Sequence, residues 1–166
     1  MNRLAIVAAL AVAGNVYAHD STVKTDLSGF EEVPVVATGA SGRFEARIAK
    51  DGQSIDYTLT FSGLQGQVRQ SHIHVAQKSV NGGIVVWLCG TATNPGPAGT
   101  QTCPQSGTVT GTIVPANVQA VATQQVAAGD LAEVIDAIRA GVAYVNVHTD
   151  LSPGGEIRGQ VDHRHH

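Results

Sequence analysis

Two histidines separated by one residue occur in the middle of the sequence, in the run Gln70-Ser71-His72-Ile73-His74-Val75. Side chains alternate between the two faces of a β-strand, so His72 and His74 would share one face and Ile73 the other. The run Ala143-Tyr144-Val145-Asn146-Val147-His148-Thr149 repeats this alternation near the end of the chain. If the apolar faces of both strands point into one core, all three histidines point out of it, toward a solvated face.

Three imidazoles on such a face would suit a transition-metal ion, because imidazole nitrogen binds copper, zinc, nickel and iron, whereas calcium and magnesium prefer oxygen. With a carboxylate or water in the fourth position, His72, His74 and His148 would form a four-coordinate site. Copper is favoured over zinc, because a site of imidazoles without thiolates binds Cu(II) more tightly at equal availability. The alternative is that a His-Ile-His strand simply carries polar residues on its wet face.

Two acidic residues could contribute to this site. Glu32 is a candidate ligand, a candidate acceptor that orients an imidazole, or only a turn residue before a proline. Glu156 lies two residues before Arg158, and we expect these opposite charges to form a cross-strand ion pair rather than a catalytic pair.

The first 18 residues have the features of a signal peptide: Arg3, a short apolar run, and a small residue, Ala18, at the end. The apolar run is shorter than the roughly 20 residues that span a membrane, so we predict export without membrane insertion, to the periplasm or outside the cell. Cleavage after Ala18 would make His19 the N-terminus, where its amine and imidazole could chelate copper. The His-rich tail, residues 162–166, is another potential chelator.

The only two cysteines, Cys89 and Cys103, flank a loop rich in glycine and proline. In an oxidising compartment such a pair is most simply a disulfide, and a free or metal-bound thiol pair is the alternative.

The charge of the chain limits its partners. It has 10 basic and 13 acidic residues, a net charge of −3, and no basic patch. Nucleic acid and anionic membranes are therefore disfavoured as partners. A metal ion is the expected partner, and a second copy of the chain or another envelope protein is left open.

Alternating patterns predict two hairpins. Residues 44–48 and 55–61 alternate around an Asp51-Gly52 turn, and pairing Ile48 with Ile55 puts every large apolar side chain on one face. In the last hairpin, pairing Val147 with Ile157 places Asn146 opposite Arg158 and His148 opposite Glu156. A first strand is expected over 25–30, and the apolar run 84–88 suggests a strand buried on both sides.

One helix is predicted after Asp130, which can cap it. Its apolar stripe has helical spacing, and Gly141 ends it. A short helix of this kind would cover an open end or edge of the sheet. Many short strands with turns and one late helix indicate an all-β fold, a Greek-key sandwich or barrel, in one domain over 19–166 with its core over about 25–161.

These motifs resemble the CHRD domain family, which is named for the repeats of chordin. The resemblance rests on four runs: Leu27-Ser28-Gly29-Phe30-Glu31-Glu32-Val33-Pro34, Ser71-His72-Ile73-His74, Ala143-Tyr144-Val145-Asn146-Val147-His148-Thr149 and Pro153-Gly154-Gly155-Glu156-Ile157-Arg158-Gly159-Gln160. It implies an immunoglobulin-like or Cu/Zn superoxide dismutase-like β-barrel and, for bacterial exported members, a metal-binding protein of the cell envelope without enzymatic activity. The polar positions typical of the family are Glu32, His72, His74, His148, Glu156 and Arg158.

Three functional hypotheses follow. The first is an exported metal-binding protein, with copper preferred, that buffers, sequesters or delivers the ion. The second is a non-enzymatic structural or protein-interaction module. The third, a dismutase-like redox enzyme, is disfavoured because three histidines are fewer than a copper site with a neighbouring zinc site requires.

Overall fold

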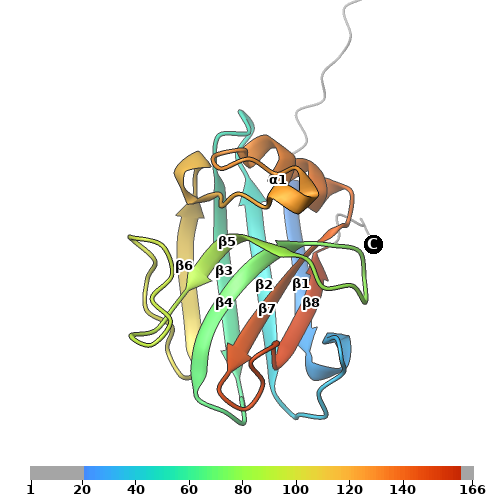
Figure 1. Ribbon diagram of the computed structural model, residues 1–166, viewed down its shortest axis with the longest axis vertical. Coiled ribbons are helices and arrows are strands. Elements are labelled where there is room, and N and C mark those ends of the chain that lie inside the picture. The colour runs from blue at the N-terminus through green and yellow to red at the C-terminus, as the bar shows by residue number, and fades with distance from the viewer. Residues whose placement is uncertain (1–20, 162–166) are drawn as a thin grey trace, which may run out of the picture.

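Eight antiparallel strands form one nearly closed sheet in the order β5-β4-β7-β8-β1-β2-β3-β6 (Figure 1). The computed structural model describes residues 21–161, so the predicted signal peptide, His19 and the tail 162–166 lie outside the described residues. The strands are β1 (Ser21–Ser28), β2 (Ser41–Ile48), β3 (Ile55–Ser62), β4 (Val68–Val75), β5 (Gly83–Cys89), β6 (Gly107–Ile113), β7 (Ala143–Thr149) and β8 (Ile157–Val161). The all-β prediction is confirmed.

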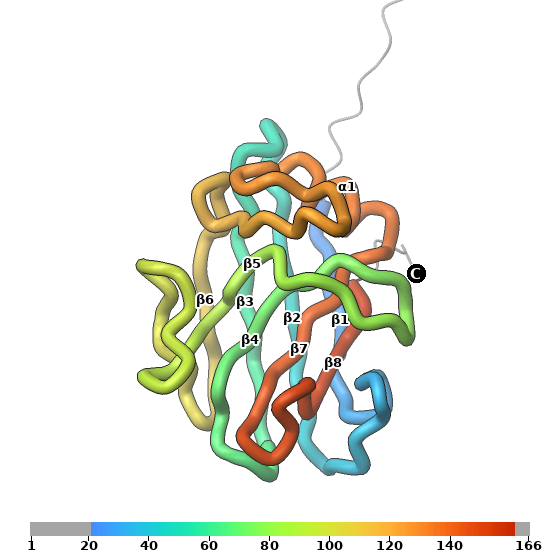
Figure 2. The backbone as a smooth tube through the Cα atoms, in the orientation of Figure 1, coloured from blue at the N-terminus to red at the C-terminus, as the bar shows by residue number. Residues whose placement is uncertain are grey.

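The sheet folds into two layers that enclose the core (Figures 1 and 2). Strands β5, β4, β7 and β8 cross in front of β6, β3, β2 and β1. The layers join where β8 meets β1, through a single pair, Ser28 with Arg158. The chain crosses from one layer to the other three times, from β3 to β4, from β5 to β6 and from β6 to β7, which is a Greek-key pattern. Apolar side chains from both layers, including Phe44, Ile73 and Val147, fill the space between them.

Both predicted hairpin registers are confirmed. In the first hairpin Ile48 pairs with Ile55, and β3 alternates strictly between buried and exposed residues. In the last, Val147 pairs with Ile157 and Asn146 with Arg158, and the ladder ends there, so it does not include the predicted pair of His148 with Glu156. A one-residue slip would turn every apolar side chain to the wrong face, so hydrophobic alternation specifies each register strongly.

The first strand differs from the prediction, since it runs from Ser21 to Ser28 rather than over 25–30. A 3₁₀ turn, η1 (Gly29–Glu31), follows it. The Gly29 carbonyl accepts hydrogen bonds from the backbone N–H groups of Glu32 and Val36, which turns the chain away from the sheet.

The predicted helix is present as α1 (Leu131–Arg139), and the Asp130 side chain accepts a hydrogen bond from the Glu133 N–H at its start. Its buried stripe consists of Leu131, Val134, Ile135 and Ile138. Figure 1 shows α1 lying across one end of the two layers. Two short 3₁₀ turns, η2 (Pro115–Asn117) and η3 (Ala122–Gln124), lead from β6 toward it. No helix among residues 21–161 has the length and apolar character needed to cross a membrane.

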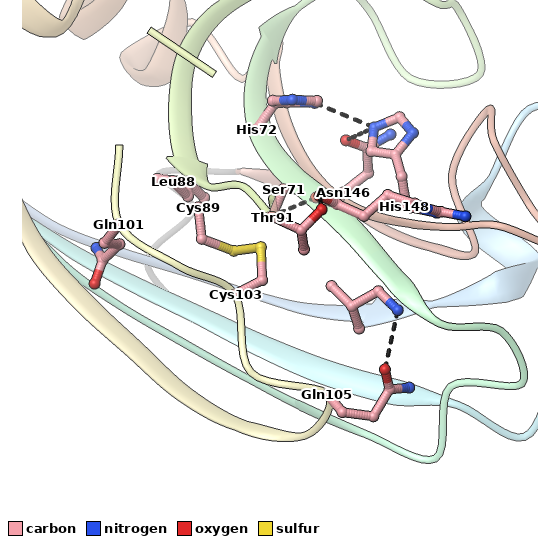
Figure 3. Close-up of a disulfide and its surroundings, with 12 residues drawn as sticks. Ser71, His72, Leu88, Cys89, Thr91, Gln101, Cys103, Gln105, Asn146 and His148 are labelled. Carbon is pink, nitrogen blue, oxygen red and sulfur yellow. Dashed lines mark hydrogen bonds between the residues drawn. A yellow bond between two sulfur atoms is a disulfide. The ribbon is translucent and has the colours of Figure 1, made fainter. Parts of the chain in front are cut away.

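The open seam of the barrel lies between the edge strands β5 and β6, and a disulfide reinforces it. Cys89 at the end of β5 is bonded to Cys103, which precedes β6 (Figure 3). The Tyr57 hydroxyl donates to the Leu88 carbonyl at 2.9 Å and accepts from Gln101 Nε2 at 2.8 Å. These contacts connect β3, β5 and the loop between the cysteines without a β-ladder across the seam.

Removing this disulfide should destabilise the fold. It closes a loop between residues 14 apart, which the chain-entropy model values at about 3 kcal/mol. We expect the double variant Cys89→Ser/Cys103→Ser to lose about 2–4 kcal/mol of unfolding free energy in urea titrations. A loss below about 1 kcal/mol would mean that the hydrogen bonds at the seam hold the loop without the crosslink.

Candidate metal centre

The pairing of β4 with β7 brings the three predicted histidines together. His72 and His74 project from β4 and His148 from β7, and in the ladder His72 stands opposite Asn146. His72 Nδ1 and His148 Nε2 are 3.2 Å apart, a contact drawn as a dashed line in Figure 3, and the two ring planes are inclined at 60°. One ring nitrogen from each histidine lies within 4.8 Å of the other two.

The expectation that these histidines face solvent is wrong. They do point away from the apolar core, since Ile73 and Val145, which alternate with them, belong to that core. Yet His72 is 0% exposed, and His74 and His148 are each 6% exposed. Three segments, here called the covering loops (residues 29–38, 76–82 and 150–155), can be followed in Figure 2 and provide partners for this face. The two-residue period predicts the face of a side chain but not whether a loop lies over that face.

The covering loops fix the tautomers of two histidines. His74 Nδ1 lies 3.0 Å from the Gly82 carbonyl oxygen, and His148 Nδ1 lies 2.8 Å from that of Pro153. A carbonyl oxygen only accepts hydrogen bonds, so each Nδ1 carries the proton. In a neutral imidazole the other nitrogen, Nε2, then bears a lone pair.

Both lone pairs face the same oxygen. Asn146 Oδ1 lies 3.1 Å from His74 Nε2 and 2.9 Å from His148 Nε2. Asn146 Oδ1 and the two Nε2 atoms, none of which carries a proton, thus face one another inside the protein. A cation would stabilise this arrangement. An ion with bonds of about 2.0–2.1 Å in a tetrahedral site holds its ligands about 3.3 Å apart. The contacts of 2.9–3.2 Å are close to this value, and the three histidine nitrogens lie within 4.8 Å of one another.

His72 completes the cluster in a different way. Without an ion, its Nδ1 can donate to the lone pair of His148 Nε2. Its own Nε2 is buried and has no hydrogen-bond partner among the described residues. A move of the His72 proton from Nδ1 to Nε2 would free Nδ1 for an ion without any change in net charge.

Burial keeps these imidazoles neutral. Desolvation, followed by the proximity of His148 and His74, lowers the pKa of His72 to about 2. Desolvation also lowers the pKa of His74 to about 4 and that of His148 below its ordinary value. All three histidines are therefore free of competing protons at neutral pH, as metal ligands must be.

Aromatic side chains pack around the imidazoles. The Tyr144 ring stacks on His74 with centroids 4.6 Å apart and planes at 2°, and the Trp87 ring meets His72 edge to face at 4.3 Å. The Arg158 guanidinium lies 3.4 Å from the Tyr144 centroid. It also donates to the Val80 carbonyl and to Asn81 Oδ1, which ties the 76–82 loop to the sheet.

Glu32 lies beside Asn146 rather than beside an imidazole. A Cβ on Gly155 would meet both the Glu32 carboxylate and Asn146 Nδ2, so these two groups adjoin one another. Burial raises the pKa of Glu32 to about 7, against the lowering effects of the Val33 N–H, Arg158 and the Asn146 side chain. Its Oε1 has no hydrogen-bond partner by distance and angle within residues 21–161.

The predicted ion pair between Glu156 and Arg158 is not formed, because each group has other partners. Glu156 is 1% exposed and accepts hydrogen bonds from the hydroxyls of Thr38 and Thr149 and from the backbone N–H groups of Gln65 and Gly66. Burial alone would raise the pKa of Glu156, but these hydrogen bonds lower it overall. Glu156 therefore anchors loops and is not a member of the histidine cluster.

Sequence reasoning overlooked Asn146 and the carbonyls of Gly82 and Pro153. The alternation in β7 places Asn146 on the same face as His148, which was the available signal. The carbonyl contacts depend on the backbone conformation of the loops, which residue types alone do not predict.

Comparison with known proteins gives one match. The model of the CHRD domain matches residues 23–161, nearly all of the described chain. No curated protein and no solved structure matches the chain.

Acid should destabilise the metal-free protein. Below pH 6.5 an unfolded chain protonates its histidines, whereas the lowered pKa values keep the three histidines of the folded protein neutral. The free energy of unfolding therefore decreases as the pH is lowered. Glu32 opposes this between about pH 7 and 4.5, because its raised pKa makes the folded state bind a proton more tightly. Three histidines outweigh one carboxylate, so urea titrations should show a net loss on the order of 3 kcal/mol from pH 7.5 to 5. Unchanged or rising stability would contradict the neutral cluster.

Replacing Glu156 should destabilise the protein and release the covering loop 29–38, which it holds through Thr38. Glu156→Gln retains the shape but loses the charge and places an NH₂ donor opposite groups that are themselves donors. We expect a loss on the order of 2–3 kcal/mol, measured by urea unfolding at pH 7. The exposed Glu45→Gln is the matched control and should change stability by less than about 0.5 kcal/mol.

Proposed function

The chain belongs to the CHRD domain family, and from this premise we propose that it is an exported protein that binds a transition-metal ion through His72, His74 and His148. The ion is copper in preference to zinc. The protein buffers, sequesters or delivers this ion and is not an enzyme. Membership of the family names no ligand, so the proposal rests on the geometry of the site.

One observation carries the proposal. The Gly82 and Pro153 carbonyls hold the protons of His74 and His148 on Nδ1, so both Nε2 lone pairs turn toward Asn146 Oδ1 at 3.1 and 2.9 Å. Histidines that serve only as core residues would place a donor opposite each buried lone pair. Carbonyl groups that orient the ligand imidazoles are the usual surroundings of a metal site.

The donor set favours copper. It offers imidazole nitrogen and no thiolate, because both cysteines are in the disulfide. For a given set of nitrogen donors the affinity for Cu(II) exceeds that for Zn(II). A disulfide is also consistent with an oxidising, extracellular setting.

The burial of the three histidines favours a role in binding and storing the ion rather than in catalysis. The three imidazoles are between 0% and 6% exposed, so the covering loops leave an ion in this position little access to solvent or to a substrate. Copper-loaded protein is therefore expected to dismute superoxide no faster than the protein without copper. Activity well above that control would favour the dismutase-like alternative.

A second candidate, a protein-interaction module, is favoured by the surface of the covering loops. Phe30, Val35 and Leu151 on these loops are 71%, 67% and 69% exposed. Exposed apolar side chains gathered on neighbouring loops can contact a partner protein. If this were the main function, partner binding would be insensitive to a chelator.

The test uses Trp87, the only tryptophan of the chain, which contacts His72. In a chain whose His19, His163, His165 and His166 are alanine, Cu(II) should bind one equivalent and quench the Trp87 fluorescence. Zn(II) should compete for the site without comparable quenching, because it is not paramagnetic.

The double variant His72→Asn/His74→Asn should weaken Cu(II) binding at least 100-fold, since it removes two of three nitrogen ligands. Arg69→Ala, on the same strand, is the control and should bind as the parent does. Circular dichroism checks that each variant is folded. Unchanged stoichiometry and affinity in a folded double variant would refute the proposal.

A further inference from the structure

We propose that Asn146 is a fourth ligand of this site and that its side-chain oxygen, Oδ1, binds the ion together with the three imidazoles. This inference rests on the proposed function, because it requires an ion at the histidines. It goes further by assigning an oxygen ligand and, with it, a preference for divalent ions over cuprous copper.

The position of Asn146 in the sheet suits this role. It lies two residues before His148 on β7, so both side chains project from the same face, and it stands opposite His72 in the β4–β7 ladder. Its side chain is 2% exposed. An amide oxygen at 2.9 Å from one Nε2 and 3.1 Å from another occupies the same cluster as the imidazole nitrogens.

The orientation of the amide has a cause on its other side. Nδ2 of Asn146 is directed toward the Gly155 backbone and the Glu32 carboxylate, as the crowding around Gly155 shows. In its ionised form the Glu32 carboxylate accepts hydrogen bonds only, so it attracts the NH₂ end of the amide and turns Oδ1 toward the histidines. Gly155 allows this approach, because a Cβ there would collide with both groups. Glu32 is thus a positioning residue, acting on the ion through Asn146.

A purely structural role for Asn146 predicts the opposite orientation. With the amide reversed, Nδ2 would donate to both Nε2 lone pairs, but Oδ1 would then face the ionised Glu32 carboxylate, and two acceptors would repel each other. One amide cannot donate from the same end to the carboxylate and to the imidazoles. A cation between Oδ1 and the imidazole nitrogens would satisfy these groups while Nδ2 stays at the Glu32 carboxylate. The oxygen and the nitrogens would then each give an electron pair to the metal.

An oxygen ligand affects the choice of metal. Amide oxygen is a hard donor, whereas Cu(I) prefers thiolate and thioether. The combination of three nitrogens and one oxygen therefore suits Cu(II) and Zn(II) better than Cu(I). Removing the oxygen should reduce the difference between the affinities of the site for Cu(II) and for Cu(I).

The test compares two substitutions of similar shape in the full chain whose His19, His163, His165 and His166 are alanine. Asn146→Leu removes the oxygen, and we expect one equivalent of Cu(II) still to bind, at least tenfold more weakly and with an altered EPR spectrum. Asn146→Asp is made together with Glu32→Gln, so that two carboxylates do not face each other, and it replaces the neutral oxygen with an anionic one and removes the NH₂ donor. If Asn146 is a ligand, Asn146→Asp tightens Zn(II) and Cu(II) binding, whereas if it is only a hydrogen-bond donor, the same change weakens binding.

The role of Glu32 is tested by a matched pair. Glu32→Gln keeps an acceptor for the Asn146 amide and should bind Cu(II) within about threefold of the parent, whereas Glu32→Ala releases the amide and should approach the affinity of Asn146→Leu. These magnitudes follow the 10–100-fold cost of removing a partner that orients a ligand.

The outcomes separate this inference from the proposed function. If the parent chain binds one equivalent and either folded Asn146 variant retains its affinity and EPR spectrum, Asn146 is not a ligand and the three-histidine site stands alone. Weaker binding by Asn146→Asp would likewise overturn the inference, as it identifies a donor role. If the parent binds no ion, the proposed function fails, and this inference fails with it.

Discussion

The pairing of β4 with β7 is the interaction on which the rest of this structure depends. It places His72 opposite Asn146 and brings His148 onto the same face, although the two strands are about 70 residues apart in sequence. The same ladder directs Ile73, Val145 and Val147 into the core. Because a slip of one residue would exchange the two faces, the packing of the apolar side chains and the gathering of the histidines are specified together.

Two buried charges then hold two of the covering loops, 29–38 through Thr38 and 76–82 through Val80 and Asn81. Glu156 and Arg158 lie close together in the sequence but do not neutralise each other. Glu156 accepts four hydrogen bonds from residues 38, 65, 66 and 149, and Arg158 donates to residues in the 76–82 loop. A buried charge without such partners would cost several kcal/mol, so the loops are constrained to stay where they provide them. One of these loops also contributes the Gly82 carbonyl to His74.

The parts of this structure that the sequence predicted are those specified by local pattern. Alternation around Asp51-Gly52 defined the first hairpin, the stripe after Asp130 defined α1, and the last hairpin placed Asn146 opposite Arg158. The face of the three histidines followed from the same two-residue period. The burial of the histidines did not follow from this period, because it results from the covering loops. The positions of the backbone carbonyls in these loops cannot be predicted from residue types. The expected Glu156–Arg158 pair failed for the same reason, since loop N–H groups and carbonyls satisfy those charges instead.

Burial changes the chemistry of the histidines more than their proximity does. On a solvated face each imidazole would have a pKa near 6.5, would exchange between its two tautomers through water and would find water for each lone pair. Beneath the covering loops, desolvation suppresses protonation, and the Gly82 and Pro153 carbonyls select one tautomer for His74 and His148. The lone pairs are then directed at Asn146 Oδ1, which is itself an acceptor, and the donor that His72 Nδ1 can supply reaches only that of His148. The strands bring the nitrogens together, but the loops make them an electron-rich cluster that only a cation, or a reversed amide, can satisfy.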